Sequence, residues 1–399
     1  MSRSRDADDP ADSLVAVVVS RADEASEHIG ERLRELGEWE TLEDDERADG
    51  DGGGTYYRSL DTARTLELRS FDALHTQIDE PAEPFSAEPS FLLFASRHAG
   101  DTGPLLTCHF TGNFGPAEYG GEDRSFAPAA PGVQRALVAA FDEFAPERYE
   151  VGIECTHHGP TQVSVPSAFA ELGSDESEWR DPAGATAVAR AIRSLATESS
   201  AGFATESSVG SVVDDSAAAA VGPTVGDPAE PRHLFGVGGG HYAPRFERVI
   251  RETAWGVGHI AADWQLSELG DPETHADTLV AAAGASDATA VLLAGDESEA
   301  ADVLADRGYR IVGERWVREV GERPLAVVDA LESDLSSVEE GLRFGAVACE
   351  SPDDYEIRDL PDDLLAAARR IDHDETRGTV FDRVIATETV ENGNVVSGR

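Results

Sequence analysis

The alternation of apolar segments along the chain predicts an α/β fold, in which a mainly parallel or mixed sheet is flanked by helices and a small C-terminal region is appended. Short, continuous apolar runs rich in β-branched residues alternate with segments in which apolar side chains recur every three or four residues. Continuous runs are typical of strands that are covered on both faces, as in parallel sheets. An apolar content of 40% over 399 residues is also sufficient for a packed core.

The predicted elements follow one another from residue 14 to residue 312. The first strand is the run at 14–19, and the first helix, at 25–36, follows the capping residues Ser20 and Asp23. Further strands are expected at 55–70 (one or two), 91–94, 105–110, 151–156, 234–237, 290–294 and 309–312. Further helices are expected at 132–144, 183–196, from Pro244 onward, 274–283 and 297–307.

Composition divides the chain into four parts. Residues 1–12 are polar and acidic and are expected to form a disordered tail. Residues 13–320 carry the alternating elements and form the predicted main domain, in which 197–231, rich in small and acidic residues, is a flexible insertion. Residues 322–399, with a helix expected at 361–371, form a C-terminal extension of unknown role.

The charge of the chain is strongly negative, with 78 acidic residues, 32 arginines, no lysine and a net charge of −46. Such a charge normally argues against a nucleic-acid partner, because phosphate binding depends on basic side chains. The acidic residues are, however, spread over the whole chain, which is typical of proteins that work in molar salt. Since the Debye length is only about 3 Å at 1 M salt, we interpret the acidity as an adaptation to the solvent.

The sequence also indicates a compartment. Three cysteines are too few for a disulfide framework, and no charged-then-apolar leader precedes Ser13. The longest apolar runs, such as 14–19 and 217–221, are far shorter than the ~20 residues that a membrane helix needs. We therefore expect a cytoplasmic protein.

Six of the eleven histidines lie in five short blocks, at 96–98, 107–113, 154–161, 238–242 and 258–260. The first four blocks lie at or just after the end of a predicted strand. Because sites in open α/β sheets form at the carboxyl ends of the strands, these histidines are expected to meet at one edge of the sheet. The other histidines are expected to be exposed: His28, His75, His233, His275 and His373.

The block around Glu154 favours a metal site. His157 and His158 can serve one pocket only if the strand has ended before them, and the Gly159-Pro160 pair makes a turn there plausible. Imidazoles with a carboxylate suit zinc, which lowers the pKa of a bound water toward ~7. The candidate ligands are His98, Glu154, His157, His158 and His241. The alternative is that some of these are hydrogen-bonded core histidines.

The glycine-rich block Gly236-x-Gly238-x-x-His241 lacks the third glycine of a dinucleotide-binding fingerprint, so NAD is not expected. Its amides can form an anion or oxyanion cradle, or the glycines can simply allow a tight turn. A cysteine nucleophile is disfavoured, because Cys108 and His109 would point to opposite faces of a strand. Cys108 and Cys155 are interpreted as core residues.

At these blocks the sequence resembles the D-aminoacyl-tRNA deacylases of the archaeal and plant type. The matching segments are 94–98, 109–115, 119–121, 156–161, 238–244 and 256–260, in the family's order and at compatible distances. The resemblance extends from residue 14 to about residue 320, whereas 197–231 and 322–399 depart from the shorter members.

The resemblance implies hydrolysis of the ester bond of D-aminoacyl-tRNA, which releases the D-amino acid and tRNA, by a water activated by zinc or histidine. It also implies one or two zinc ions and a core similar to nucleoside phosphorylases and peptidyl-tRNA hydrolases. The expected partner is the acceptor end of an aminoacyl-tRNA, with no membrane and no DNA, and a monomer is expected.

The site residues follow from the resemblance together with the histidine blocks. The expected catalytic residues are Glu154, His157, His158, Thr161 and His241. Substrate binding is expected from Arg97, His98, His109, Asn113, Gly238, Gly239, Gly240, Tyr242 and His259. Three alternatives stay open: a zinc-dependent aminopeptidase or amidohydrolase, a binding module for a nucleoside or tRNA end without turnover, and a nucleoside phosphorylase.

Overall fold

The computed structural model describes residues 13–197, 232–295, 298–359, most of 361–390, and 394–398. The described residues form two compact units, each treated by itself here. Of the described residues, the first unit holds those in 13–197, 232–252 and 256–311, and the second holds those in 253–255 and 312–398. The predicted tail at 1–12 and almost all of the predicted insertion at 197–231 lie outside the described residues.

An eight-stranded sheet in the order β2-β3-β4-β1-β5-β8-β6-β7 forms the centre of the first unit. Its strands are β1 (Leu14–Ser20), β2 (Trp39–Asp44), β3 (Gly54–Ser59), β4 (Thr65–Phe71), β5 (Pro89–Arg97), β6 (Leu105–His109), β7 (Glu150–Ile153) and β8 (Ser167–Gly173). The pairs β1·β4, β1·β5, β5·β8 and β6·β7 are parallel, whereas β2·β3, β3·β4 and β6·β8 are antiparallel. The predicted α/β class with a mixed sheet is therefore confirmed.

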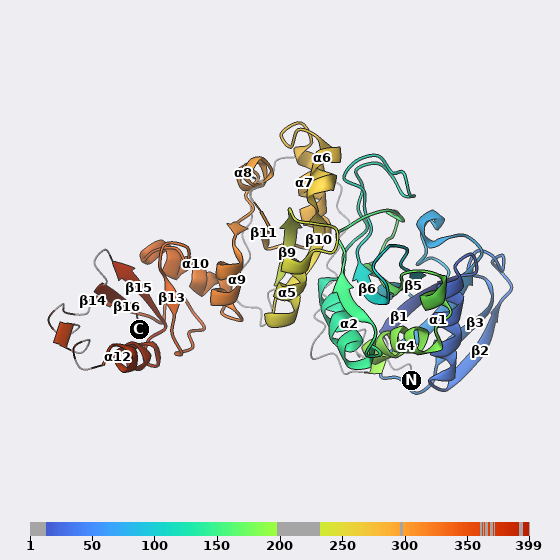
Figure 1. Ribbon diagram of the computed structural model, residues 1–399, viewed down its shortest axis with the longest axis horizontal. Helices are drawn as coiled ribbons and strands as arrows, with labels where there is room; N and C mark the ends of the chain where they lie inside the picture. The colour runs from blue at the N-terminus through green and yellow to red at the C-terminus, as the bar shows by residue number, and fades with distance from the viewer. Residues whose placement is uncertain are drawn as a thin grey trace, which may run out of the picture. The chain divides into compact units, whose positions relative to one another are not determined.

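Three helices lie side by side on one face of this sheet: α1 (Glu24–Glu35), α2 (Pro131–Phe144) and α4 (Pro182–Thr197) (Figure 1). The carboxylate of Asp23 caps α1 by accepting hydrogen bonds from the amides of Ala25 and Ser26. Both faces of β1 are buried, which explains its continuous apolar run. The short helix α3 (Glu176–Trp179) precedes α4.

The opposite face of the sheet is covered mostly by irregular segments, apart from the short η2 (His75–Gln77). Leu14, Leu92 and Phe169 of the sheet pack there with Phe85 and Val163 of these segments. This face is the one that carries the candidate site. Irregular segments follow no simple repeat, so apolar periodicity predicts no helix or strand there.

A second, four-stranded sheet in the order β10-β9-β11-β12 completes the first unit, with β12 at its border. Its strands are β9 (His233–Val237), β10 (Gly256–Ala261), β11 (Ala290–Leu293) and β12 (Ile311–Val312). The helices of this part are α5 (Pro244–Glu252), α6 (Asp263–Leu269), α7 (Ala276–Ala285) and α8 (Ser298–Asp306). β9 pairs in parallel with β10 and β11, and its residues Phe235 and Val237 pack on α7 and α8 through a shared apolar cluster.

The second unit combines helices with an antiparallel sheet in the order β13-β15-β16-β14. Its elements are α9 (Glu314–Val320), α10 (Leu325–Asp334), β13 (Arg343–Phe344), β14 (Ile357–Asp359), α12 (His373–Phe381), β15 (Ala386–Val390) and β16 (Asn394–Gly398). Trp316 of α9 packs against Trp255 within this unit. Several residues of the helix expected at 361–371 lie outside the described residues.

Most predicted elements of the first unit occur within a few residues of their expected bounds, but three strands were not predicted. β8 was missed because its buried run is interrupted by Glu171 and rich in alanine, which is no clear strand signal. β2 and β10 were missed because one is rich in acidic residues and the other in glycine.

Among the described residues, no helix has both the length and the apolar character that crossing a membrane requires. The cytoplasmic location stays a prediction.

Replacing Gly30 by alanine is expected to destabilise the first unit. A Cβ at this position of α1 would lie 2.9 Å from Cγ2 of Val19, so the buried contact must rearrange at a cost of about 1–3 kcal/mol. Gly284→Ala in α7 is the matched control, because its Cβ meets nothing within 4 Å and alanine gains about 1 kcal/mol of helix propensity. Urea unfolding in molar KCl should show lower stability for Gly30→Ala and higher stability for Gly284→Ala. Equal stability of the two variants would contradict this packing.

Candidate active site

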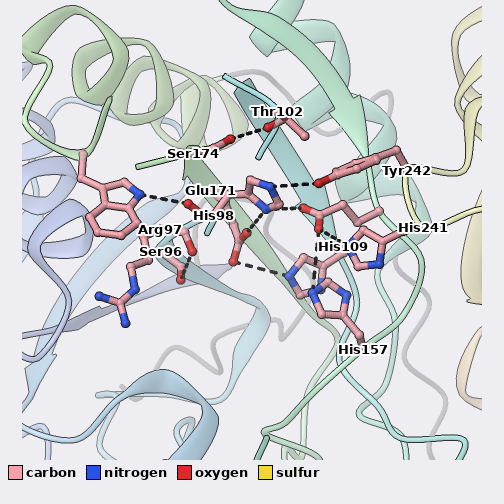
Figure 2. A network of polar contacts seen from close by, with 12 residues as sticks. Ser96, Arg97, His98, Thr102, His109, His157, Glu171, Ser174, His241 and Tyr242 are labelled. Carbon is pink, nitrogen blue, oxygen red and sulfur yellow. Dashed lines mark hydrogen bonds and ion pairs between the residues drawn. The ribbon is translucent and has the colours of Figure 1, made fainter. Parts of the chain in front are cut away.

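A cavity of about 1050 Å³ lies on the face of the large sheet that the irregular segments cover. Its walls come from segments that are far apart in the sequence, among them the end of β5, residues 112–120, Glu154 with the two following histidines, and the start of α6. Most of the predicted site residues line it: Arg97, His98, Asn113, Glu154, His157, His158, His241 and Tyr242. Figure 2 shows several of these side chains converging on one point.

Two buried glutamates form the centre of the site: Glu154, which follows β7, and Glu171 in the middle of β8. Glu154 contacts Nε2 of His241 at 2.8 Å and Nδ1 of His98 at 3.2 Å. Glu171 contacts Nδ1 of His98 at 3.6 Å and Nε2 of His109 at 3.4 Å. The imidazole of His98 therefore joins the two carboxylates (Figure 2).

Strand pairing explains how Glu171 reaches this position. It lies beside Ser96 of β5 on one side and beside Thr107 of β6 on the other. Because β5 runs parallel and β6 antiparallel to β8, the histidines that end β6 and follow β5 approach Glu171 from opposite directions. The prediction that they meet at one edge where parallel strands end was wrong. They meet on a face of the sheet.

Both carboxylates are ionised, although they are buried. Burial by itself raises the pKa of Glu154, but hydrogen bonds from His241 and His98 outweigh it and hold the pKa well below its usual range. Burial likewise opposes ionisation of Glu171, and the contacts of His109 and His98 lower its pKa. In return, the two carboxylates overcome the effect of burial and raise the pKa of His98 to about 10. His98 is therefore an imidazolium between two carboxylates.

His157 and His158 stay neutral beside this charged group. Burial and the nearby His109 hold the pKa of His157 well below its ordinary value and lower that of His158 to about 3. Nδ1 of His157 donates to the carbonyl of Cys155 at 2.8 Å, which leaves the lone pair on Nε2, 3.8 Å from Glu154. β7 ends at Ile153, so both histidines reach the same cavity, as the sequence required.

The donor atoms of the site fit a zinc ion. Three overlapping groups have donor atoms within 4.8 Å of one another: His109 with His157 and His158, Glu154 with His157 and His241, and His98 with Glu154 and Glu171. Imidazole nitrogen and carboxylate oxygen are ordinary zinc ligands. Two buried atoms, Oε1 of Glu154 and Nε2 of His109, meet His98 at 3.2 Å and Glu171 at 3.4 Å without ideal hydrogen-bond geometry. Buried polar atoms are usually fully hydrogen-bonded, so these two are compatible with a further group at the site.

Two predicted residues support the cavity wall. The side-chain amide of Asn113 donates to the carbonyls of Gly120 and Glu122. The hydroxyl of Thr161 accepts a hydrogen bond from the amide of Glu122 at 2.9 Å and does not line the cavity. A catalytic role for Thr161 is therefore not supported, because the hydroxyl is held on the loop rather than toward the glutamates.

The glycine block forms a turn rather than an oxyanion cradle. The amide of Gly238 donates to the carbonyl of Ala261, and the amide of Gly239 donates to the carboxylate of Asp263 at 2.7 Å. Gly238 and Gly239 have φ of 92° and 86°, a left-handed conformation that side chains rarely adopt. Gly238, Gly239 and Gly240 do not line the cavity. The turn instead delivers His241 and Tyr242 to the site.

His259 is a core residue and not a substrate ligand, which corrects its predicted role. It is fully buried and outside the cavity. Nε2 donates to the carbonyl of Ala127 at 2.9 Å, and Nδ1 accepts from the hydroxyl of Thr156 at 3.0 Å. That hydroxyl in turn accepts from the amide of Ile260. The hydrogen bonds of this neutral imidazole are therefore complete, and they tie β10 to the segment that carries His157.

Two residues of the site were missed. Glu171 is central, and an acidic residue inside an apolar run at 167–173 was the available signal. His75, expected to be exposed, is buried, lines the cavity and lies 3.8 Å from Asp23. His28, His233 and His275 are partly buried, and the exposure of His373 is not described. His109, predicted to bind substrate, lies behind the wall and stacks on His157 with ring centroids 4.2 Å apart.

An α/β fold with imidazoles that contact two ionised glutamates in a large cavity is typical of an enzyme active site. The sequence model of the D-aminoacyl-tRNA deacylase family matches residues 85–311. The chain therefore belongs to this family and is a hydrolase that acts on ester bonds.

Individual relatives agree with this assignment. A D-aminoacyl-tRNA deacylase of Halorubrum lacusprofundi is 47% identical and covers 96% of this chain and 78% of its own length. Another from Haloarcula marismortui is 46% identical over 96% of this chain and 80% of its own length. A crystal structure of a conserved protein of unknown function has a TM-score of 0.61 at 25% identity and covers 78% of this chain and 98% of its own.

The buried His259 predicts a loss of stability in acid. Burial lowers its pKa to about 4, whereas the unfolded chain binds the proton near the ordinary value of about 6.5. The stabilisation by the neutral imidazole of His259 is therefore complete above pH 6.5. As the pH falls toward 4, the free energy of unfolding decreases by up to about 3 kcal/mol. His259→Gln should show a shallower decline in the free energy of unfolding over this range than the unchanged chain. An identical decline in both would contradict the assignment of a neutral buried imidazole.

Proposed function

We propose that this site hydrolyses the ester bond between a D-amino acid and the terminal ribose of tRNA, with zinc as its cofactor. The family supplies the substrate class. The observation that supports the chemistry is the pair of ionised glutamates, which contact charged and neutral imidazoles at the wall of a cavity large enough for an aminoacylated nucleotide.

The zinc ligands that we propose are Glu154, His157 and His241, with His158 adjacent. When bound, zinc supplies a Lewis acid that acidifies water at neutral pH. Nε2 of His241 and Oε2 of Glu154 lie 2.8 Å apart, so zinc binding would replace the hydrogen bond between them with coordination by both residues. His157 keeps its Nε2 lone pair toward the same point, because its Nδ1 proton is committed to the carbonyl of Cys155. His158, whose Nδ1 donates to the carbonyl of Gly159 at 2.7 Å, keeps its Nε2 lone pair to accept a proton from the attacking water.

His98 and Tyr242 are the proposed donors to the ester oxygen as negative charge develops. Nδ1 of His98 faces the two carboxylates, while Nε2 lies 3.4 Å from the hydroxyl of Tyr242. Burial raises the pKa of Tyr242, so its hydroxyl keeps the proton. Fixed donors of this kind stabilise an oxyanion. They take the role that the sequence had assigned to the amides of the glycine block.

The substrate and metal are tested together by D-tyrosyl-tRNA hydrolysis in molar KCl. We expect release of tyrosine from the D-ester, little from the L-ester, loss of activity after dialysis against a chelator, and recovery with zinc. Hydrolysis at an unchanged rate by protein shown to be metal-free would exclude the zinc requirement. Zinc-loaded protein that cleaves small D-peptides but not the ester would favour the peptidase alternative, and phosphate-dependent nucleoside cleavage would favour a phosphorylase.

Single substitutions test the proposed residues. His157→Ala and His241→Ala should each lower kcat/KM by about 10²–10⁴-fold, because each removes a metal ligand or proton acceptor. His275→Ala is the matched control, since this histidine is partly buried at the start of α7 and outside the cavity. Circular dichroism and the thermal midpoint check that the variants fold. Activity near that of the control would remove the substituted histidine from the site.

A further inference from the structure

Exposed aromatic side chains gather at the active-site cavity. Among the described residues, six large hydrophobic side chains are exposed, and the three aromatic ones are Tyr119 at 73%, Tyr242 at 39% and Trp264 at 41%. All three line the cavity. Isolated exposed apolar residues need no explanation, but a group around one concave site marks a binding surface. Trp264 and Tyr119 have no role in the hydrolysis proposed above.

Trp264 lies in the first turn of α6. Its ring centroid lies 6.4 Å from that of His241. The preceding residue, Asp263, accepts from the amide of Gly239, so the start of α6 is tied to the glycine turn. The indole therefore presents an exposed surface directly beside a proposed zinc ligand.

The segment beneath Tyr119 is also fixed. The carbonyl of Tyr119 accepts from the amide of Gly159, and Asn113 holds the carbonyl of Gly120 at 3.0 Å. Gly120 has a φ of 88°, and a Cβ there would lie 2.0 Å from the carbonyl oxygen of Thr76. The backbone is thus packed against its neighbours while the phenol ring remains exposed.

Charge does not provide an alternative means of holding a polyanion at this cavity. Arg97 is the only arginine among its described lining residues, and its guanidinium stacks on Trp179. Asp23, Glu118 and Glu268 line the same cavity, and the whole chain has a net charge of −46. Phosphate contacts weaken steeply with salt, whereas stacking of a base on an aromatic ring uses apolar surface.

We propose that Trp264 and Tyr119 form a stacking platform for the unpaired terminal nucleobases of the acceptor end. Unstacked bases of single-stranded ends are commonly bound on aromatic side chains. A base stacked on Trp264 places its own ribose, which carries the ester, next to His241 and Glu154. The platform thus positions the ester of the bound nucleotide relative to the proposed zinc ligands. This inference rests on the function proposed above.

The test uses the full chain in molar KCl, with Trp264→Ala, Trp264→Phe and Tyr119→Ala. Leu60→Ala is the control, because Leu60 is 63% exposed but outside the cavity. Loss of one stack should raise KM for D-aminoacyl-tRNA by about tenfold, with a smaller change in kcat, and Trp264→Phe should retain most of the affinity. A KM unchanged in Trp264→Ala and Tyr119→Ala would overturn the platform.

Calorimetric titration with AMP gives a second measurement that requires no turnover. AMP should bind the unchanged chain and the Leu60→Ala variant, bind Trp264→Ala about tenfold more weakly, and bind far better than ribose 5-phosphate. AMP binding of this kind in a chain that fails to hydrolyse the ester would reject the proposed function but support the platform. The platform would be overturned if ribose 5-phosphate bound as tightly as AMP. It would also be overturned if Trp264→Ala bound AMP with unchanged affinity but showed a higher KM whose size depended on the amino acid. That result would mean that the aromatic residues contact the side chain of the amino acid.

Discussion

Two carboxylates buried on one face of a sheet are the constraint on which the rest of the site depends. Removing an unpaired carboxylate from water costs several kcal/mol, so Glu154 and Glu171 are tolerated only because imidazoles compensate them. Their contacts raise the pKa of His98 and of His109 despite burial, while His157 and His158 remain neutral. The charge on His98 therefore offsets part of the negative charge of the two carboxylates, and the site keeps uncharged nitrogen lone pairs beside ionised oxygen.

This arrangement requires a mixed sheet. Glu171 can face His98 and His109 together only because β8 pairs in parallel with β5 and antiparallel with β6. In a wholly parallel sheet, the two histidines would leave the sheet at the same edge and could not approach one strand residue from opposite directions. The helices α1, α2 and α4 occupy the other face, so the site is walled by irregular segments. Those segments provide the close backbone approaches that Gly120 and Gly159 make possible.

The sequence predicts this site only where local patterns carry the information. The order of strands and helices, the histidine blocks and the end of β7 before His157 follow from apolar runs and turn residues. The strand carrying Glu171 does not, because one carboxylate within an alanine-rich run resembles no periodic template. The antiparallel direction of β6 is likewise a long-range property. Residue type also predicted site roles for His259 and Thr161. Their hydrogen bonds instead join segments that are distant in the sequence, and neither residue lines the cavity.

The acidity of the chain restricts how any nucleic acid can be held. At a net charge of −46, a long-range field would repel a polyanion in dilute solution. In molar salt this repulsion is screened beyond about 3 Å, but the same screening removes most of the benefit of basic residues. Recognition must then come from contacts at atomic distance. The cavity offers contacts of that kind. It is lined by imidazoles and carboxylates that can bind zinc, by the hydroxyl of Tyr242, and by the exposed rings of Tyr119 and Trp264. An acidic surface and a nucleic-acid substrate are therefore compatible here, because affinity depends on this wall rather than on total charge.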